Sequence, residues 1–154
     1  MTGMAWEIRV ATAGDLEAVV RLHEADLIGG HGDAWTPQTR PAYEAAFAAI
    51  EASPDTDLYV AIEDGVVVGT FQLQMLRKLT ERGARKAVLE SVQVRADRRS
   101  RGLGARMIAE AERLARARGA TGLQLTSNKR RTAAHRFYER QGYERSHEGF
   151  RKTL

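Results

Sequence analysis

The 154-residue sequence contains no cysteine. This absence excludes disulfide bridges, a cysteine nucleophile and thiolate metal sites. No apolar run approaches the ~20 residues that a membrane-spanning helix requires. The first ten residues, MTGMAWEIRV, also lack the basic start and continuous apolar stretch of a signal peptide. We therefore expect a cytoplasmic protein with no membrane partner.

Length and composition are those of an ordinary globular chain. Hydrophobic residues make up 43% of the sequence and charged residues 29%, which is usual for a soluble domain. A chain of this length can bury a core of its own but leaves no room for a second one. We expect residues 1–154 to form a single domain.

The positive charge is concentrated in two places. The net charge is +4, and basic residues gather at Arg95–Arg101 and again at Lys129–Arg131. Neither cluster is interleaved with the aromatic residues on which nucleic-acid bases stack. Nucleic acid is therefore an unfavoured partner, and a phosphorylated small molecule fits the two clusters better. The arginines further along the chain, such as Arg113, are interpreted as a solvated surface.

Hydrophobic periodicity predicts alternating strands and helices without internal repeats or linkers. The expected elements are a strand at Glu7–Val10, a helix that begins at Thr12–Asp15 and ends near Ile28, a helix from about Pro41 to Ala52, strands at Leu58–Ile62, Val66–Leu76 and Ala87–Val94, a helix that Gly119 closes, a strand at Gly122–Thr126, a helix at Thr132–Gln141, and short strands near Tyr143 and at Phe150–Leu154.

The connections between these elements predict how the strands pair. Glu63-Asp64-Gly65 is a tight-turn signal, so the strands on either side should form an antiparallel hairpin. A polar, basic connection at Arg77–Lys86 leads to a third arm of the sheet. The strand at Ala87–Val94 and the strand at Gly122–Thr126 are joined through a helix, so they should be parallel.

The most informative segment is the turn between the strand that ends at Val94 and the next helix. Gly102 and Gly104 allow the backbone to pass close to a ligand, and the first turn of the helix leaves N–H groups without internal partners. These donors and the helix dipole favour anions, and Arg98, Arg99 and Arg101 add positive charge. The turn is interpreted as a pyrophosphate site. The alternative is an ordinary glycine turn whose arginines face water.

The spacing of the turn separates it from the common phosphate motifs. No lysine follows Gly104, as a P-loop would require, and Met107 stands where a dinucleotide-binding fingerprint has its third glycine. What remains is Arg99-x-x-Gly102-x-Gly104, which resembles the acyl-CoA signature of the GNAT superfamily of N-acyltransferases. A second segment, Ala133–Glu144, resembles the last-helix pattern of the same superfamily. The order of elements is also similar over nearly the whole chain.

The resemblance implies a mixed α/β (α+β) fold. Its central sheet would be mostly antiparallel, with one splayed parallel strand pair and flanking helices. It also implies transfer of an acetyl group from acetyl-CoA, as co-substrate, to a primary amine of a small molecule or peptide. The attack would occur directly in a ternary complex. Relatives are often dimers, so a homodimer is possible.

The resemblance assigns cofactor contacts to the turn and to the strand before it. Backbone N–H groups of the loop would hold the pyrophosphate, and the splayed strand would offer free backbone groups to the pantetheine arm and the thioester carbonyl. Asn128 follows a strand and is placed near the cofactor, with turn capping an equally weighted alternative. The expected cofactor-binding residues are Val92, Val94, Arg99, Ser100, Arg101, Gly102, Leu103, Gly104, Ala105 and Asn128.

Tyr138 occupies the position at which relatives use a tyrosine to protonate the departing thiolate. A phenol has a reference pKa near ~10 and can therefore donate a proton at neutral pH. The alternative is an aromatic side chain that packs beside Phe137. Many relatives carry an asparagine seven residues before this tyrosine, where the present sequence has Arg131. The usual role of that asparagine is therefore in doubt here.

Glu90 interrupts an otherwise apolar strand and is the candidate proton acceptor. Strict alternation would place it on the same face as Val88, Val92 and Val94. Partial burial would raise its pKa toward a useful range. The alternative is a carboxylate paired with a basic neighbour such as Arg85 or Lys86.

His31 and Asp33 lie in a glycine-rich loop between the first two helices, where relatives often line the acceptor pocket. Surface loops commonly carry binding groups, although they also contain histidine for no special reason. The acidic residues of this region, Glu24, Asp26 and Asp33, could attract a cationic acceptor. The other histidines share no metal-like spacing, so no metal is expected.

Two other functions remain open. The chain could be a non-catalytic acyl-CoA-binding or regulatory module, which would keep the glycine turn but not need Tyr138 and Glu90. It could also bind nucleic acid through its basic clusters, with a strong dependence on salt.

Overall fold

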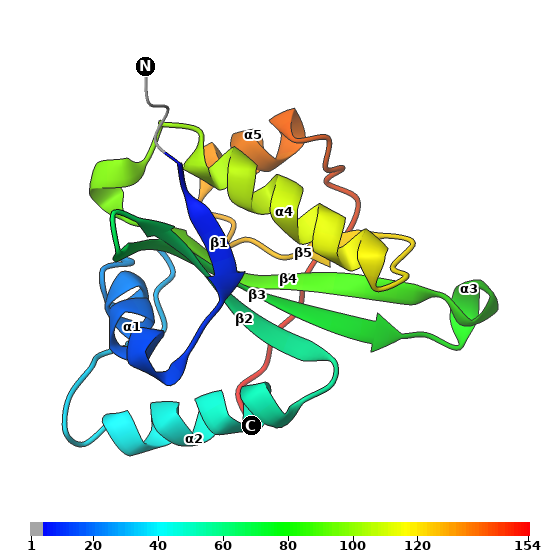
Figure 1. Ribbon diagram of the computed structural model, residues 1–154. Coiled ribbons are helices and arrows are strands. Elements are labelled where there is room, and N and C mark those ends of the chain that lie inside the picture. Colours follow the sequence, from blue (N-terminus) through cyan, green and yellow to red (C-terminus); the bar gives the residue numbers. More distant parts are fainter. Residues whose placement is uncertain (1–4) are drawn as a thin grey trace.

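The computed structural model describes residues 5–154, which form a five-stranded sheet covered by helices on both faces (Figure 1). The spatial order of the strands follows the sequence. All neighbouring strands are antiparallel except the last pair, which is parallel. This confirms the expected mixed α/β class. The strands are β1 (Glu7–Val10), β2 (Thr56–Glu63), β3 (Val66–Arg77), β4 (Arg85–Val94) and β5 (Leu123–Leu125).

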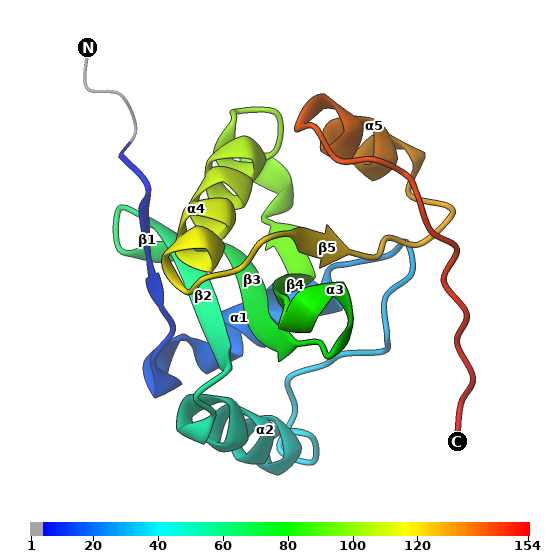
Figure 2. The ribbon, with the colours of Figure 1, turned by 90° about the vertical axis from the view of Figure 1, so that its right-hand side faces the viewer.

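The helices are divided between the two faces of the sheet (Figures 1 and 2). One face carries α4 and α5, and the other carries α1 and α2. None of the helices in the described part of the chain is long and apolar enough to cross a membrane. The helices are α1 (Leu16–Glu24), α2 (Arg40–Ala52), α3 (Thr80–Gly83), α4 (Leu103–Ala117) and α5 (Thr132–Arg140), with short 3-10 turns at Ala13–Asp15 and Ala96–Arg98.

Each face of the sheet has its own hydrophobic core. Under α4, the side chains of Phe71, Leu89 and Met107 are almost fully buried. Gly69 of β3 lets Met107 approach, since a β-carbon at this glycine would lie 2.7 Å from the Met107 sulfur. On the other face, Val60 and apolar residues of α1 and α2 form the second cluster. The two cores fix α4 and α1 on opposite sides of β3 and β4.

The β2–β3 hairpin is formed as expected. Asp64 and Gly65 at its tip both have positive φ, 49° and 78°, which is the conformation of the two-residue turns that join twisted antiparallel strands. Thr12 and Asp15 also start the first helical segment as expected, because the Asp15 carboxylate accepts the backbone N–H of Thr12 at 2.8 Å. The β4–β5 pair is parallel, as the connection through α4 predicts.

The first long helix is shorter than expected. It ends at Glu24 rather than near Ile28. The Asp26 carboxylate accepts the backbone N–H of Ile28 at 3.2 Å, and a local side-chain bond of this kind competes with the next helical turn. Residues 25–39 therefore form a long connection between α1 and α2 rather than extra helix.

The polar connection between β3 and β4 is also shorter than expected. Arg77 pairs with Arg85 at the ends of the two strands, so β4 begins two residues before Ala87. The remaining residues form α3, a tight turn in which Glu81 and Arg82 have positive φ. Glu81 pairs with both Lys78 and Lys86, which ties this turn to the ends of the two strands.

The two short strands expected near Tyr143 and at Phe150–Leu154 are absent from the structure. The chain beyond Tyr143 is extended and exposed, and it follows no other strand (Figure 2). A strand requires a hydrogen-bonded neighbour, and this segment has none within residues 5–154. The prediction of further strands was therefore wrong.

Candidate active site

The glycine turn has the geometry of an anion site. Gly102 has φ 87°, a left-handed conformation that favours glycine, and α4 begins directly after it. No side chain caps this helix by a hydrogen bond. The first backbone bond of the helix runs from Arg106 to the Gly102 carbonyl at 3.0 Å. The N–H groups of Leu103, Gly104 and Ala105 therefore remain available to a ligand, beside the positive end of the helix dipole.

The arginines before the turn have different surroundings. Arg98 is paired with the buried carboxylate of Glu63 and with Asp97, so its positive charge is compensated within the protein. Arg99 donates a hydrogen bond to the Val94 carbonyl at 3.2 Å and keeps further guanidinium donors for a phosphate. Ser100 and Arg101 are exposed beside Gly102.

The second glycine of the turn serves packing rather than backbone conformation. A β-carbon at Gly104 would lie 3.3 Å from the ring of Phe137, so the glycine allows α4 and α5 to touch. A β-carbon at Gly102, in contrast, would meet nothing within 4 Å. The two glycines therefore have separate roles, and only Gly102 is required by its φ angle.

The parallel strands separate next to the turn. Pairing between β4 and β5 runs from Ala87 to Leu89 on the β4 side, while β4 itself continues to Val94. The part of β4 that contains Val92 and Val94 is thus paired with β3 on one side only, among the described residues. Its other edge is not paired with a strand along Val92 and Val94, just before the segment that leads to the glycine turn. This is the splayed strand pair expected from the sequence.

A β-bulge in β4 corrects the expected placement of Glu90. Thr70 pairs with Gln93 and Gln72 pairs with Glu90, so Phe71 alone stands opposite two residues of β4. Ser91, one of the two, has φ 54°. Side chains therefore change faces at this point, and strict alternation fails.

As a result, Glu90 does not share a face with Val92 and Val94. The two valines pack against the core under α4, whereas Glu90 is exposed on the side of α1 and α2. The expected partial burial of Glu90 is wrong for the same reason. Its alternative partners are engaged elsewhere, because Arg85 pairs with Asp55 and Lys86 pairs with Glu81.

Tyr138 lies on α5 with its ring in an aromatic cluster. It meets Phe137 and Tyr143 edge-on, at centroid distances of 5.2 and 5.9 Å. Burial raises the pKa of Tyr138 above its ordinary value, and the positive charge of Arg131 acts in the opposite direction. The Tyr143 hydroxyl donates to Glu112 at 3.1 Å, but the Tyr138 hydroxyl has no hydrogen-bond partner within residues 5–154. A buried ring with an uncommitted phenol fits a proton donor.

Asn128 forms the turn before α5. Its side-chain oxygen accepts the backbone N–H of Arg130 at 2.9 Å, and its carbonyl accepts the backbone N–H of Arg131 at 2.9 Å. These bonds show the turn-capping alternative for Asn128. Gly29 lies so close that a β-carbon there would be 2.8 Å from the Asn128 amide nitrogen. The connection between α1 and α2 therefore touches the loop between β5 and α5.

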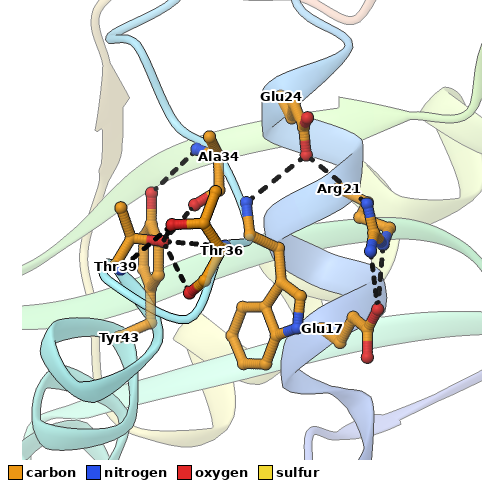
Figure 3. Close-up of polar contacts among 8 residues, drawn as sticks. Glu17, Arg21, Glu24, Ala34, Thr36, Thr39 and Tyr43 are labelled. Carbon is orange, nitrogen blue, oxygen red and sulfur yellow. Dashed lines mark hydrogen bonds and ion pairs between the residues drawn. The ribbon is translucent and has the colours of Figure 1, made fainter.

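That connection carries His31 and Asp33, and its shape is held by hydrogen bonds (Figure 3). The Tyr43 hydroxyl donates to the Asp33 carboxylate at 2.8 Å and accepts the backbone N–H of Ala34 at 3.3 Å. Thr36 and Thr39 close a turn nearby. Burial and the Asp33 hydrogen bond raise the pKa of Tyr43. His31 itself is exposed.

An ion pair joins the same connection to Arg131, the residue directly before α5. The Arg131 guanidinium binds the Asp26 carboxylate, and both side chains are mostly buried, with 26% and 17% of their surfaces exposed. Half-buried His23 lies in the field of these charges and of Asp33, and burial lowers its pKa. Sequence reasoning named Asp26 as an acid and Arg131 as a departure from the family pattern. It did not predict that they would meet.

Two further observations concern metal binding and the cavity nearest to α1 and α2. Residues 5–154 contain no group of three His, Cys, Asp or Glu side chains that could hold a metal ion. A cavity of about 420 Å³ opens between α1 and α2, with Trp35, Arg40 and Glu44 in its wall. None of the residues named for the glycine turn or the splayed strands lines it. The anion site and this cavity are thus separate.

Comparisons with known proteins agree with this geometry. The model of the acetyltransferase (GNAT) family matches residues 16–143. An aminoalkylphosphonate N-acetyltransferase from Salmonella typhimurium is 34% identical over 96% of this chain and 91% of its own length. A crystal structure described as a transcriptional regulator from Bacillus halodurans is 33% identical. It covers 97% of this chain and 100% of its own, with a TM-score of 0.93.

A more distant structure shares the fold alone. An acetyltransferase from Trypanosoma brucei is 23% identical over 97% of this chain and 100% of its own, with a TM-score of 0.80. The family match covers the glycine turn, the splayed strands and Tyr138. The chain therefore belongs to the acetyltransferase (GNAT) family and is an acetyl-CoA-dependent N-acetyltransferase.

Proposed function

We propose that residues 1–154 act as one catalytic domain that acetylates the primary amine of a small molecule by direct attack in a ternary complex. The observation that carries this proposal is the juxtaposition of three features at one end of the sheet. These are the uncapped start of α4 after Gly102, the separation of β4 from β5, and the uncommitted hydroxyl of Tyr138. Each meets one need of the reaction.

The glycine turn is the proposed site of the acetyl-CoA pyrophosphate. The free N–H groups of Leu103, Gly104 and Ala105 would bind its oxygens, and the backbone of Ser100 would lie beside them. Arg99 and Arg101 would add charge from the exposed side. The free edge of β4 at Val92 and Val94 would align the pantetheine arm and polarise the thioester carbonyl. Asn128, in the loop between β5 and α5, would add a further contact to the cofactor.

The reaction then needs two proton transfers. Glu90 is the proposed acceptor, directly or through water, of the proton that leaves the ammonium. Its side chain is exposed on the side of the sheet that carries α1 and α2, the two helices joined by the loop with His31 and Asp33. The amine nitrogen attacks the thioester carbon, the new C–N bond forms and the C–S bond breaks. The Tyr138 phenol gives its proton to the thiolate and regains one from the new amide nitrogen.

The acceptor is proposed to be a small amine, with His31 and Asp33 in its binding loop. The relative from Salmonella typhimurium acts, by its name, on aminoalkylphosphonates, and this supports an amine that carries an acidic group. The acids that could have attracted a polycation are already engaged. Glu24 pairs with Arg21, Asp26 with Arg131, and Asp33 with the Tyr43 hydroxyl.

The test measures thiol release from acetyl-CoA with aminoethylphosphonate as the amine, for the wild type, Tyr138→Phe, Glu90→Gln and the double variant. Loss of turnover of roughly 100-fold in each single variant is expected for proton transfer, with acetyl-CoA binding unchanged. Full turnover by the double variant would contradict these roles. Acetyl-CoA binding by a wild type that acetylates no amine would favour a non-catalytic binding module.

The setting of the enzyme is also a proposal. We place it in the cytoplasm, because its sequence has neither cysteine nor a long apolar run. A homodimer is supported by the extended segment after α5, where Phe150 and Leu154 are almost fully exposed, and by the open edge of β5. Sedimentation of the wild type and a Phe150→Ser variant tests this, since a dimer held by this segment would dissociate in the variant.

A further inference from the structure

The Asp26–Arg131 ion pair lies close to the elements that carry the proposed reaction centre. The loop that carries Arg131 follows β5, at the carboxyl end of the parallel strand pair and therefore beside the part of β4 that β5 no longer covers. Arg131 is also the residue directly before α5, and its positive charge acts on the Tyr138 phenol. Asp26 faces Arg131 from the connection between α1 and α2.

The pair is enclosed rather than free in solvent. Only 17% of the Asp26 side chain and 26% of the Arg131 side chain are exposed. Gly29, three residues after Asp26, packs closely against Asn128, three residues before Arg131. The charged and titratable groups around the pair are His23 at the end of α1 and His31 and Asp33 in the loop. Two full charges of opposite sign thus stand side by side, mostly shielded from solvent.

Such a pair selects its ligand by charge balance. An ammonium that took Asp26 alone would leave the Arg131 guanidinium without a counter-charge in a partly dry site, which is unfavourable. An anion that bound Arg131 alone would likewise leave the Asp26 carboxylate without a counter-charge. A molecule with both charges satisfies both residues, because each exchanges its present partner for an opposite charge on the ligand.

We infer that Asp26 and Arg131 together form the acceptor-recognition site and that the acceptor is a small zwitterion, with a primary ammonium and an anionic group such as a phosphonate or carboxylate. The ammonium binds the Asp26 carboxylate, and the anionic group binds the Arg131 guanidinium. The planar set of N–H donors on a guanidinium suits two parallel hydrogen bonds to such a group. This inference rests on the acetyltransferase function and adds to it the class of acceptor and the residues that read it.

The experiment compares kcat/KM for aminoethylphosphonate with that for propylamine, which has no anion, at saturating acetyl-CoA. The wild type should prefer the zwitterion on the order of 100-fold. Arg131→Gln should abolish this preference mainly by raising KM for aminoethylphosphonate. Arg131→Lys, which keeps the charge but not the planar set of donors, should be intermediate. Lys129→Gln is the matched control. It removes a nearby, well-exposed positive charge and should leave the preference unchanged.

A purely structural clamp would behave differently. The exchanged variant Asp26→Arg/Arg131→Asp restores an ion pair between the same loops, so a clamp would recover full activity on aminoethylphosphonate. Recognition predicts that this variant folds but stays inactive on the zwitterion, since its amine would now be drawn away from the reacting position. Circular dichroism and acetyl-CoA binding verify the fold of each variant.

The outcomes separate this inference from the function on which it rests. If the wild type acetylates both amines equally well, or if Arg131→Gln keeps the preference, the inference is overturned while the acetyltransferase function stands. Recovery of activity in the exchanged variant would also overturn it. If the wild type acetylates neither of these amines nor any other amine in a panel that includes spermidine, both the proposed function and this inference are overturned.

Discussion

Gly104 of α4 faces the ring of Phe137 of α5 so closely that a β-carbon would lie 3.3 Å from it. The glycine therefore sets the distance between the helix that carries the anion site and the helix that carries Tyr138. The same turn holds Gly102, whose φ of 87° shapes the start of α4. Cofactor site and proposed proton donor are thus positioned by neighbouring residues of one short segment.

The contact at Gly104 can be tested by enlarging the residue. Gly104→Val should lower the free energy of unfolding by about 1–3 kcal/mol, the usual cost of overpacking, because the Phe137 ring must move. Urea denaturation measures the change. Gly149→Val is the control, since a β-carbon at Gly149 meets nothing within 4 Å. Equal stability of the two variants would contradict the packing role of Gly104.

Tyr138 should act through its hydroxyl and not through its ring. Tyr138→Phe keeps the aromatic contacts and should lower kcat with little change in KM for acetyl-CoA. Burial raises the pKa of Tyr138, so the donor form persists and kcat should not fall with rising pH below ~10. Tyr143→Phe is the control, because the Tyr143 hydroxyl is committed to Glu112. A comparable loss of kcat in the control would contradict the assignment.

Acid should weaken the start of α1. Arg9 binds the Asp15 carboxylate at 2.7 and 3.1 Å, and this hydrogen bonding lowers the pKa of Asp15 against the opposing effect of burial. A carboxyl group with a lowered pKa contributes stability above its unfolded value near ~3.9. That stability is lost as the pH falls through the folded value.

Asp15→Asn should therefore destabilise the protein by about 1 kcal/mol at neutral pH, the usual value of a capping interaction. The difference from the wild type should shrink as the pH falls from the unfolded value near ~3.9 through the lowered folded pKa of Asp15, because the carboxylate is then protonated. Chemical denaturation across this range measures it. Glu44→Gln breaks an exposed pair with Arg40 and should change stability by much less. A constant deficit at all pH values would contradict the electrostatic part of the account.

Local signals predicted those features that depend on local chemistry. The Asp64-Gly65 turn and the parallel order of β4 and β5 both follow from short-range rules. Glu90 was misplaced because a bulge at Ser91 changes the face of every later side chain. Such a bulge produces no regular pattern of apolar residues, so it could not be recognised from the sequence.

Long-range contacts were beyond the same rules. Asp26 and Arg131 are 105 residues apart, and neither has a local pattern that names the other as partner. The engagement of Arg98 by Glu63 depends likewise on a tertiary contact. The strands expected after α5 failed because the alternation of a segment says nothing about whether a neighbour is present to pair with it.

The central claim is that the turn at Gly102 binds acetyl-CoA, and calorimetric titration tests it most directly. The wild type should bind with micromolar affinity, and Gly102→Val should bind at least tenfold more weakly. Gly119, just after the other end of α4, has a similar φ of 83°. Gly119→Val is therefore the control, because it imposes a similar backbone strain away from the turn and should bind acetyl-CoA like the wild type. No binding by the wild type, or equal binding by Gly102→Val, would contradict the account.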